Sequence, residues 1–151
     1  MFSKYFGLIV LGLSVCSAFG QETRVQFKDL PSAVQTAAND QSRGATVKGY
    51  SKEIEKGKTE YEVQLLVNGK KRDVSIDPDG KVIETEEVVA LSSVPKKAQD
   101  GIKHEAKGAK IEKVEIVKSD QPTVYEALVR QNGKKHEIRV LENGNKAPTE
   151  H

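Results

Sequence analysis

An internal repeat limits the folds open to this 151-residue chain more than any other pattern in it. When the sequence is shifted by 64 residues, Pro31 falls on Pro95 and Gly80 falls on Gly144. In the same register, the run Asn68-Gly69-Lys70-Lys71 falls on Asn132-Gly133-Lys134-Lys135. Such self-similarity is typical of a supersecondary unit repeated in tandem. We therefore predict a first unit over residues 29–91 and a second over residues 92–146.

Each unit is expected to begin with a short helix. Asp29 and Ser93 stand two residues before a proline, and we predict that they cap the two helices. Apolar residues at helical spacing predict one buried stripe on each helix: Leu30, Val34, Ala37 and Ala38, then Val94, Ala98 and Ile102. Gly44 and Gly108 are the predicted C-cap glycines. Gly101, inside the second helix, is expected to weaken it by about 1 kcal/mol relative to alanine.

Asn-Gly pairs predict a tight β-hairpin in each unit, because a type I′ turn needs positive φ at both central residues. The pairs are Asn68-Gly69 and Asn132-Gly133. Two-residue loops predict these facing pairs: Tyr61 with Ile76, Val63 with Val74, Tyr125 with Val140, and Ala127 with Ile138. These residues share one face of their hairpins, and charged pairs such as Glu126 and Arg139 share the other. Such a division is expected of an antiparallel sheet with one packed face.

Further strands complete the predicted units. Leading strands are expected over residues 46–54 and 111–117, and another over residues 81–89 after the turn at Gly80. The chain from Asn145 is polar and is expected to fray, with residues 147–151 as a tail. Since a lone unit of about 60 residues is marginally stable by burial, the hairpins are expected to merge over one shared core. The predicted class is α+β, with two tandem α-β-β-β(-β) repeats, one antiparallel sheet and both helices on one face.

The N-terminus has the pattern of a secretory signal peptide over residues 1–20. One lysine precedes a short apolar run, and small residues lead to a predicted cleavage between Gly20 and Gln21. Residues 21–28 then form an N-terminal extension. Alternatively, Cys16 ends a lipobox-like run and carries a lipid anchor. We expect a secreted or periplasmic monomer without a transmembrane segment after removal of the signal.

Composition excludes several classes of protein. Charged residues make up 30% of the chain, but the formal net charge is only +2, which argues against a nucleic-acid binder. A single cysteine excludes a disulfide framework and a cysteine-rich metal site. Nucleophile motifs, phosphate-binding loops and dinucleotide fingerprints do not occur. We expect no enzyme, no cofactor and no catalytic or metal-binding residues.

The repeated pattern resembles exported bacterial PepSY-like domains, in the group likened to β-lactamase-inhibitor proteins. The resemblance rests on the proline at each helix start, the Gly-Ala pairs at Gly44 and Gly108, and the Tyr-Glu and Asn-Gly-Lys-Lys motifs. It spans residues 29 to about 145. It implies helices on one face of an antiparallel sheet, and a non-catalytic module that restrains a peptidase or another protein outside the cytoplasm.

Few residues are candidates for direct chemistry. His104 and His136 have no partner at ligand or nucleophile spacing, and we expect both at the surface. The run Asp77-x-Asp79-Gly80 resembles the start of a calcium loop, but a Pro-Asp-Gly turn explains it and the later ligands are absent. The basic hairpin ends are expected to keep the strands soluble.

Binding anchors in protein interfaces are typically aromatic residues or arginine. The hairpin register commits Tyr61 and Tyr125 to the core. Tyr50 and Phe27 are the aromatic residues that remain, with Arg130 and Arg139 on the second hairpin. Of these, Tyr50, Arg130 and Arg139 are the candidate binding residues. The alternative to a protein-binding module is a periplasmic protein that binds or senses a small ligand, peptide or ion on the polar sheet face.

Overall fold

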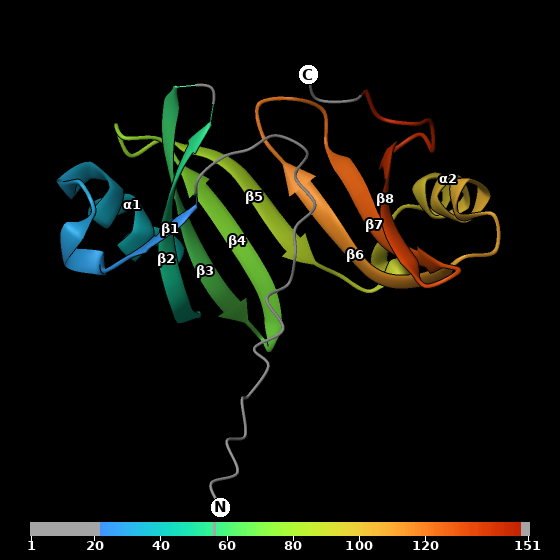
Figure 1. The fold of residues 1–151 in the computed structure, drawn as a ribbon, viewed down its shortest axis with the longest axis horizontal. Coiled ribbons are helices and arrows are strands. Elements are labelled where there is room, and N and C mark those ends of the chain that lie inside the picture. The colour runs from blue at the N-terminus through green and yellow to red at the C-terminus, as the bar shows by residue number, and fades with distance from the viewer. Residues whose placement is uncertain (1–21, 56, 149–151) are drawn as a thin grey trace, which may run out of the picture.

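The computed structural model describes residues 22–148 except Lys56, and within them the protein is α+β (Figure 1). The predicted signal peptide, its cleavage site and Cys16 lie outside the described residues. Eight strands form one antiparallel sheet in chain order. The elements are β1 (Thr23–Val25), α1 (Ser32–Gln41), β2 (Thr46–Glu55), β3 (Lys58–Val67), β4 (Lys70–Ile76), β5 (Val82–Val88), α2 (Lys96–Ala106), β6 (Lys110–Lys118), β7 (Val124–Gln131) and β8 (Lys134–Leu141).

The two Asn-Gly hairpins have the predicted geometry. Asn68 and Gly69 have φ of 51° and 78°, and Asn132 and Gly133 have φ of 51° and 77°. All four predicted facing pairs are confirmed, two between β3 and β4 and two between β7 and β8. Each turn therefore fixes which side chains of its hairpin point toward a helix.

The predicted helix caps are wrong. Pro31 and Pro95 occupy the N-cap positions of α1 and α2, and neither cap makes a side-chain hydrogen bond. Asp29 and Ser93 instead end short 3-10 helices, η1 (Phe27–Asp29) and η2 (Leu91–Ser93). The residue before a proline is held extended, so the chain leaves the 3-10 turn before the α-helix begins.

A glutamine in the first turn ties each helix to the residue before its proline. The Gln35 amide donates to the carbonyl oxygen of Leu30 at 2.8 Å, and the Gln99 amide donates to that of Val94 at 2.7 Å. These bonds orient the apolar residue that precedes each helix. Leu30 and Val94 are both buried.

Glycines allow each helix to touch the turn that follows a hairpin. A Cβ on Gly80, after β4, would lie 2.7 Å from the carbonyl oxygen of Ala33 in α1. A Cβ on Gly101, in α2, would overlap the carbonyl oxygen of Gly144 in the turn after β8. The helix-propensity cost predicted for Gly101 therefore leaves out a close backbone contact that only glycine permits.

Both helices pack on the same face of the sheet, at its opposite ends (Figure 1). Under α1 lies a first buried cluster formed by Leu30, Val34, Ala38, Val63, Leu65, Val74 and Ile76. Under α2 lies a second cluster formed by Val94, Ala98, Ile102, Ala106, Val114, Tyr125, Ala127, Val129, Ile138 and Val140.

The prediction of one shared core is wrong, because the two clusters have no residue in common. Between them runs β5, which turns Thr85 and Glu87 toward the helix-bearing face. Glu87 is exposed, so no apolar layer continues across the centre of the sheet. The sheet is continuous from one half to the other, but the core is not.

Both ends of the described chain add to the sheet. Strand β1, which the sequence analysis does not predict, pairs with β2 over residues 50–52. Near the C-terminus, the Ala147 N–H donates to the Arg139 carbonyl oxygen at 2.9 Å, and Ala147 is buried. Ordered structure therefore extends at least to this residue.

Candidate functional site

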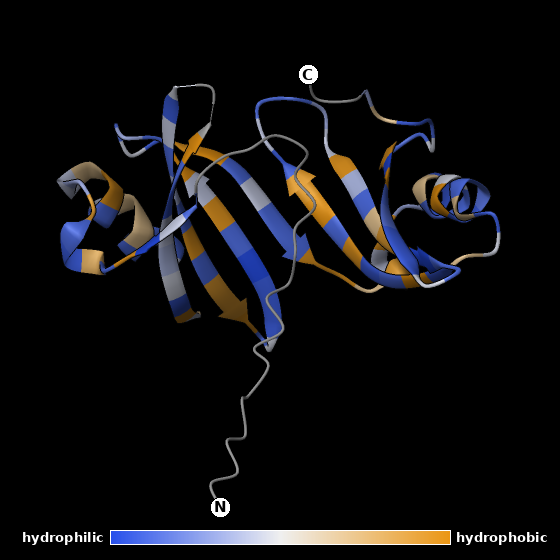
Figure 2. Ribbon diagram, viewed as in Figure 1, coloured by the Kyte–Doolittle hydropathy of each residue, from blue (hydrophilic) through white to orange (hydrophobic). Residues whose placement is uncertain are grey.

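The second face of the sheet is covered by neither helix, and we call it the helix-free face. Strand residues alternate between the two faces, which gives the banded hydropathy of Figure 2. The register assigns the following residues to the helix-free face, strand by strand: Ser51 and Glu53 of β2; Glu60, Glu62, Gln64 and Leu66 of β3; Lys71, Asp73 and Ser75 of β4; Glu84, Glu86 and Val88 of β5; Lys113, Glu115 and Val117 of β6; Val124, Glu126, Leu128 and Arg130 of β7; and Lys135, Glu137, Arg139 and Leu141 of β8.

Three polar or charged residues of the described chain are buried, and all three lie on the helix-free face. They are Ser51, Asp73 and Glu115, with exposed fractions of 2%, 8% and 6%. Polar residues on an uncovered sheet face are normally solvated. Burial of a carboxylate costs free energy unless it is paired, so these positions mark a specialised part of the surface.

Ion pairs join neighbouring side chains across this face. Lys71 Nζ lies 2.5 Å from Asp73 Oδ2, and Lys113 Nζ lies 2.7 Å from Glu115 Oε2. On the last two strands, Arg139 Nε lies 2.6 Å from Glu126 Oε1. Each of these cations thus faces a carboxylate two residues away or directly across the ladder.

Carboxylates nevertheless outnumber cations at the centre of the face. Burial, together with the neighbouring charges of Glu115, Glu126, Glu84 and Asp73, raises the pKa of Glu86 to about 8. Burial likewise raises the pKa of Asp73, although the hydrogen bond from Lys71 opposes the shift. We call Asp73, Glu86, Glu115 and Glu126 the acidic cluster.

One atom of the acidic cluster has no partner. Oδ1 of Asp73 is buried and accepts no hydrogen bond, whereas Oδ2 faces Lys71. Within residues 22–148, no group of three or more acidic, histidine or cysteine side chains is placed to hold a metal ion. The cluster therefore presents acceptor atoms that are spread over several strands rather than gathered around one point.

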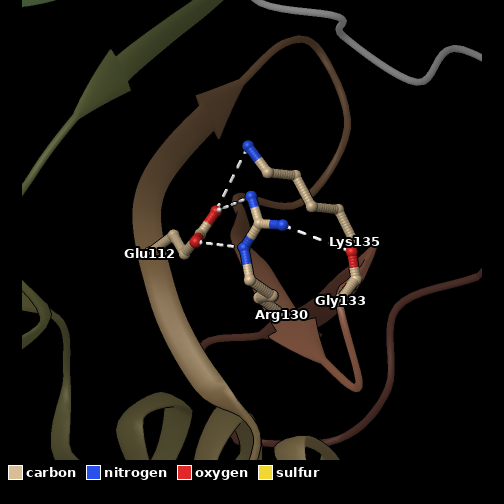
Figure 3. Close-up of polar contacts among 4 residues, drawn as sticks. All are labelled: Glu112, Arg130, Gly133 and Lys135. Carbon is tan, nitrogen blue, oxygen red and sulfur yellow. Dashed lines mark hydrogen bonds and ion pairs between the residues drawn. The ribbon is translucent and has the colours of Figure 1, made fainter.

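The three predicted binding residues do not lie together. Tyr50 packs partly against the first core, and its ring lies 5.6 Å from that of Phe27. Arg139 lies on the helix-free face beside Glu126. Arg130 lies at the hairpin end of that face, where its guanidinium donates to both oxygens of Glu112 (Figure 3).

Arg130 belongs to a small network that ties three strands together. It also donates to the Gly133 carbonyl oxygen at 3.3 Å, and Lys135 reaches the same Glu112 carboxylate at 3.2 Å (Figure 3). The hydrogen bond from Arg130, together with that from Lys135, holds the pKa of Glu112 below its usual value. Glu112 lies at the bulge of β6, so the network holds an irregular strand against the hairpin.

The remaining candidates have local roles. His104 and His136 are exposed, as predicted. Asp77 Oδ1 accepts the N–H groups of Asp79 and Lys81 at 3.0 and 2.9 Å, which explains the acidic turn before β5. Shallow surface hollows lie beside the helices, one lined by residues 95–97 with Glu142 and Asn143.

Sequence reasoning did not find the acidic cluster. Hairpin turns fix β3 against β4 and β7 against β8, but Glu86 meets Asp73 and Glu115 only through the pairing of β5 with β4 and β6. A bulge between Ser75 and Ile76 sets that register. The available signal was the acidic run of β5, which has no equivalent in the second half.

No protein-family model matches this chain, and no curated protein matches it. A DUF2874 family protein from Bacteroides ovatus has a TM-score of 0.64 and 16% identity, over 79% of this chain and 85% of that one. A Bacteroides eggerthii protein provisionally described as periplasmic has a TM-score of 0.66 and 18% identity, over 79% of this chain and 86% of that one. A BLIP-like protein from Bacteroides fragilis has a TM-score of 0.61 and 22% identity, over 78% of this chain and 84% of that one.

These similarities concern the fold. Helices α1 and α2 have 10 and 11 residues, and neither is long and apolar enough to cross a bilayer. A similar fold recurs in these proteins at sequence identities of 16–22%. The chain shares its fold with these three Bacteroides proteins.

Proposed function

We propose that this protein is a non-catalytic binding module of the periplasm that docks onto another protein through the helix-free face. The observation that carries the proposal is the placement of Ser51, Asp73 and Glu115, the buried polar residues of the described chain, on that one face. Interfaces that rely on charge gain specificity from such fixed ionic groups. The scarcity of exposed aromatic anchors also favours recognition by charge.

The periplasmic location is part of the proposal. It is supported by the signal-peptide pattern of residues 1–20 and by the provisional description of the Bacteroides eggerthii protein with this fold. We also propose that the two halves are tandem PepSY-like repeats. The matching φ angles of the two Asn-Gly turns and the matching bonds of Gln35 and Gln99 support this. The partner class suggested by the resemblance is an extracytoplasmic peptidase.

A photo-cross-linking experiment tests the docking face. A benzophenone amino acid is placed at Ser75, on β4 of the helix-free face, or at Thr36, on the exposed side of α1. We expect a discrete adduct with one envelope protein from position 75 and none from position 36. An adduct from position 36 alone would reject this face as the docking surface.

The same two benzophenone variants distinguish a protein-binding module from a protein that binds a small ligand. A ligand-binding protein would give no adduct from either position. Its melting temperature would rise with a small-molecule fraction of the envelope extract. That pair of results would contradict the protein-binding proposal.

A further inference from the structure

Two like-charged cross-strand pairs lie side by side on the helix-free face. The register places Asp73 opposite Glu86, and Glu115 opposite Glu126. Because Val88 faces Glu115, the two acidic pairs are separated by only two residues along β5. Like charges directly opposite one another destabilise a sheet. When these carboxylates are ionised, their mutual repulsion therefore opposes folding.

The chain neutralises three of these four carboxylates. Lys71 pairs with Asp73, Lys113 with Glu115, and Arg139 with Glu126. Within the described residues, no basic group forms an ion pair with Glu86, and the groups that shift its pKa most after burial are all carboxylates. Beside it, the Asp73 side chain is only 10% exposed, yet Oδ1 has no hydrogen-bond partner.

The spacing of the carboxylates decides which kind of cation suits this face. A metal ion needs ligands around one point, and the described residues offer no such group. A guanidinium instead presents five donors in a plane and can bridge separated carboxylates. Along the same row of the sheet, Glu86 is followed by Val117, Val124 and Leu141. This apolar row suits the aliphatic stem of a long cationic side chain.

We propose that an arginine side chain of the partner protein docks on Glu86, beside Asp73, with its stem along Val124. This inference rests on the proposed docking function and names the chemistry of the partner at that face. The guanidinium donates to the Glu86 carboxylate, which has no basic partner among the described residues, and its charge offsets the repulsion within the acidic cluster.

A peptide titration followed by NMR tests the proposal. The probe is the blocked peptide Gly-Val-Arg-Val-Gly, and the same peptide with glutamate in place of arginine is its control. We expect the arginine peptide to shift the amide signals of β4, β5 and β6, and the glutamate peptide to shift none. Glu86→Gln should weaken binding about tenfold, the loss of one charge-assisted interaction.

The matched control variant is Glu87→Gln, one residue along β5. It makes the same glutamate-to-glutamine change, but Glu87 points to the helix-bearing face and should leave binding unchanged. Equal weakening by both variants would show attraction by overall charge and overturn the proposal. A calcium chloride titration that raises the melting temperature of the wild type but not of Glu86→Gln, without peptide binding, would show a metal site and also overturn it.

Failure of this inference can be told apart from failure of the docking function. If the arginine peptide does not bind while position 75 still gives its cross-link, the arginine is rejected and the docking face stands. If neither result is obtained, both proposals fail.

Discussion

At Gly101, a close backbone contact outweighs helix propensity in deciding which residue is tolerated. Helix propensity alone predicts that alanine at this position would stabilise α2 by about 1 kcal/mol. The structure sets the Gly101 Cα against the backbone of Gly144, where a Cβ has no room. Overlap with backbone is costly because a turn cannot rotate away as a flexible side chain can.

We predict that Gly101→Ala destabilises the protein by about 1–3 kcal/mol, the usual cost of overpacking. Urea denaturation followed by circular dichroism measures the free energy of unfolding. Lys103→Ala, on the exposed side of the same helix, is the control and should change stability by less than about 0.5 kcal/mol. A stabilised Gly101→Ala variant would show that the helix and the turn do not touch.

Glu86 predicts an unusual pH dependence of stability. Its pKa is raised to about 8 in the folded protein, above the ordinary value of 4.5. Between these values the folded state binds more protons than the unfolded state, so the free energy of unfolding falls as pH rises. The raised pKa values of Asp73, Glu62 and Glu137, each shifted first by burial, act in the same direction.

We therefore expect a higher melting temperature at pH 6 than at pH 9. Glutamine does not ionise, so Glu86→Gln should reduce this difference by raising the melting temperature at pH 9. Glu87→Gln should retain the wild-type profile. A wild-type protein that is more stable at pH 9 than at pH 6 would contradict the prediction.

At the scale of the elements, the hairpins could be predicted from the sequence and the helix starts could not. Asn-Gly fixes a two-residue turn by local sterics, and the register of the strands follows from the turn. A helix start depends on competition between local conformations. Here the extended residue before each proline favours a separate 3-10 turn over a side-chain cap at Asp29 or Ser93.

The two hairpin tyrosines are equivalent in sequence but not in burial. Tyr125 is 7% exposed within the second core, whereas Tyr61 only borders the first. We predict that Tyr125→Ala costs about 3–5 kcal/mol, as for a buried aromatic residue, and that Tyr61→Ala costs less. Chemical denaturation of both variants tests the order. If both variants lost the same free energy of unfolding, strand pairing rather than burial would determine the cost of removing these tyrosines.

For the whole molecule, the sequence predicted one continuous sheet correctly but missed both the division of the core and the acidic cluster. Both omissions concern β5. Its residues pair with strands on either side, and only those pairings decide that Glu87 interrupts the apolar layer while Glu86 joins the carboxylates. Such register depends on the packing of both halves, so no local pattern reveals it.

Because the two core clusters share no residue, a substitution in one should not alter the free-energy cost of a substitution in the other. Ile76 lies in the first core and Ile102 in the second, and both are fully buried. We predict that Ile76→Val and Ile102→Val each cost about 0.5–1.5 kcal/mol. The double variant should lose the sum to within about 0.5 kcal/mol, as expected for sites without common partners. Equilibrium urea unfolding of the four proteins measures the coupling, and a larger interaction energy would show that the β5–β6 ladder transmits packing between the halves.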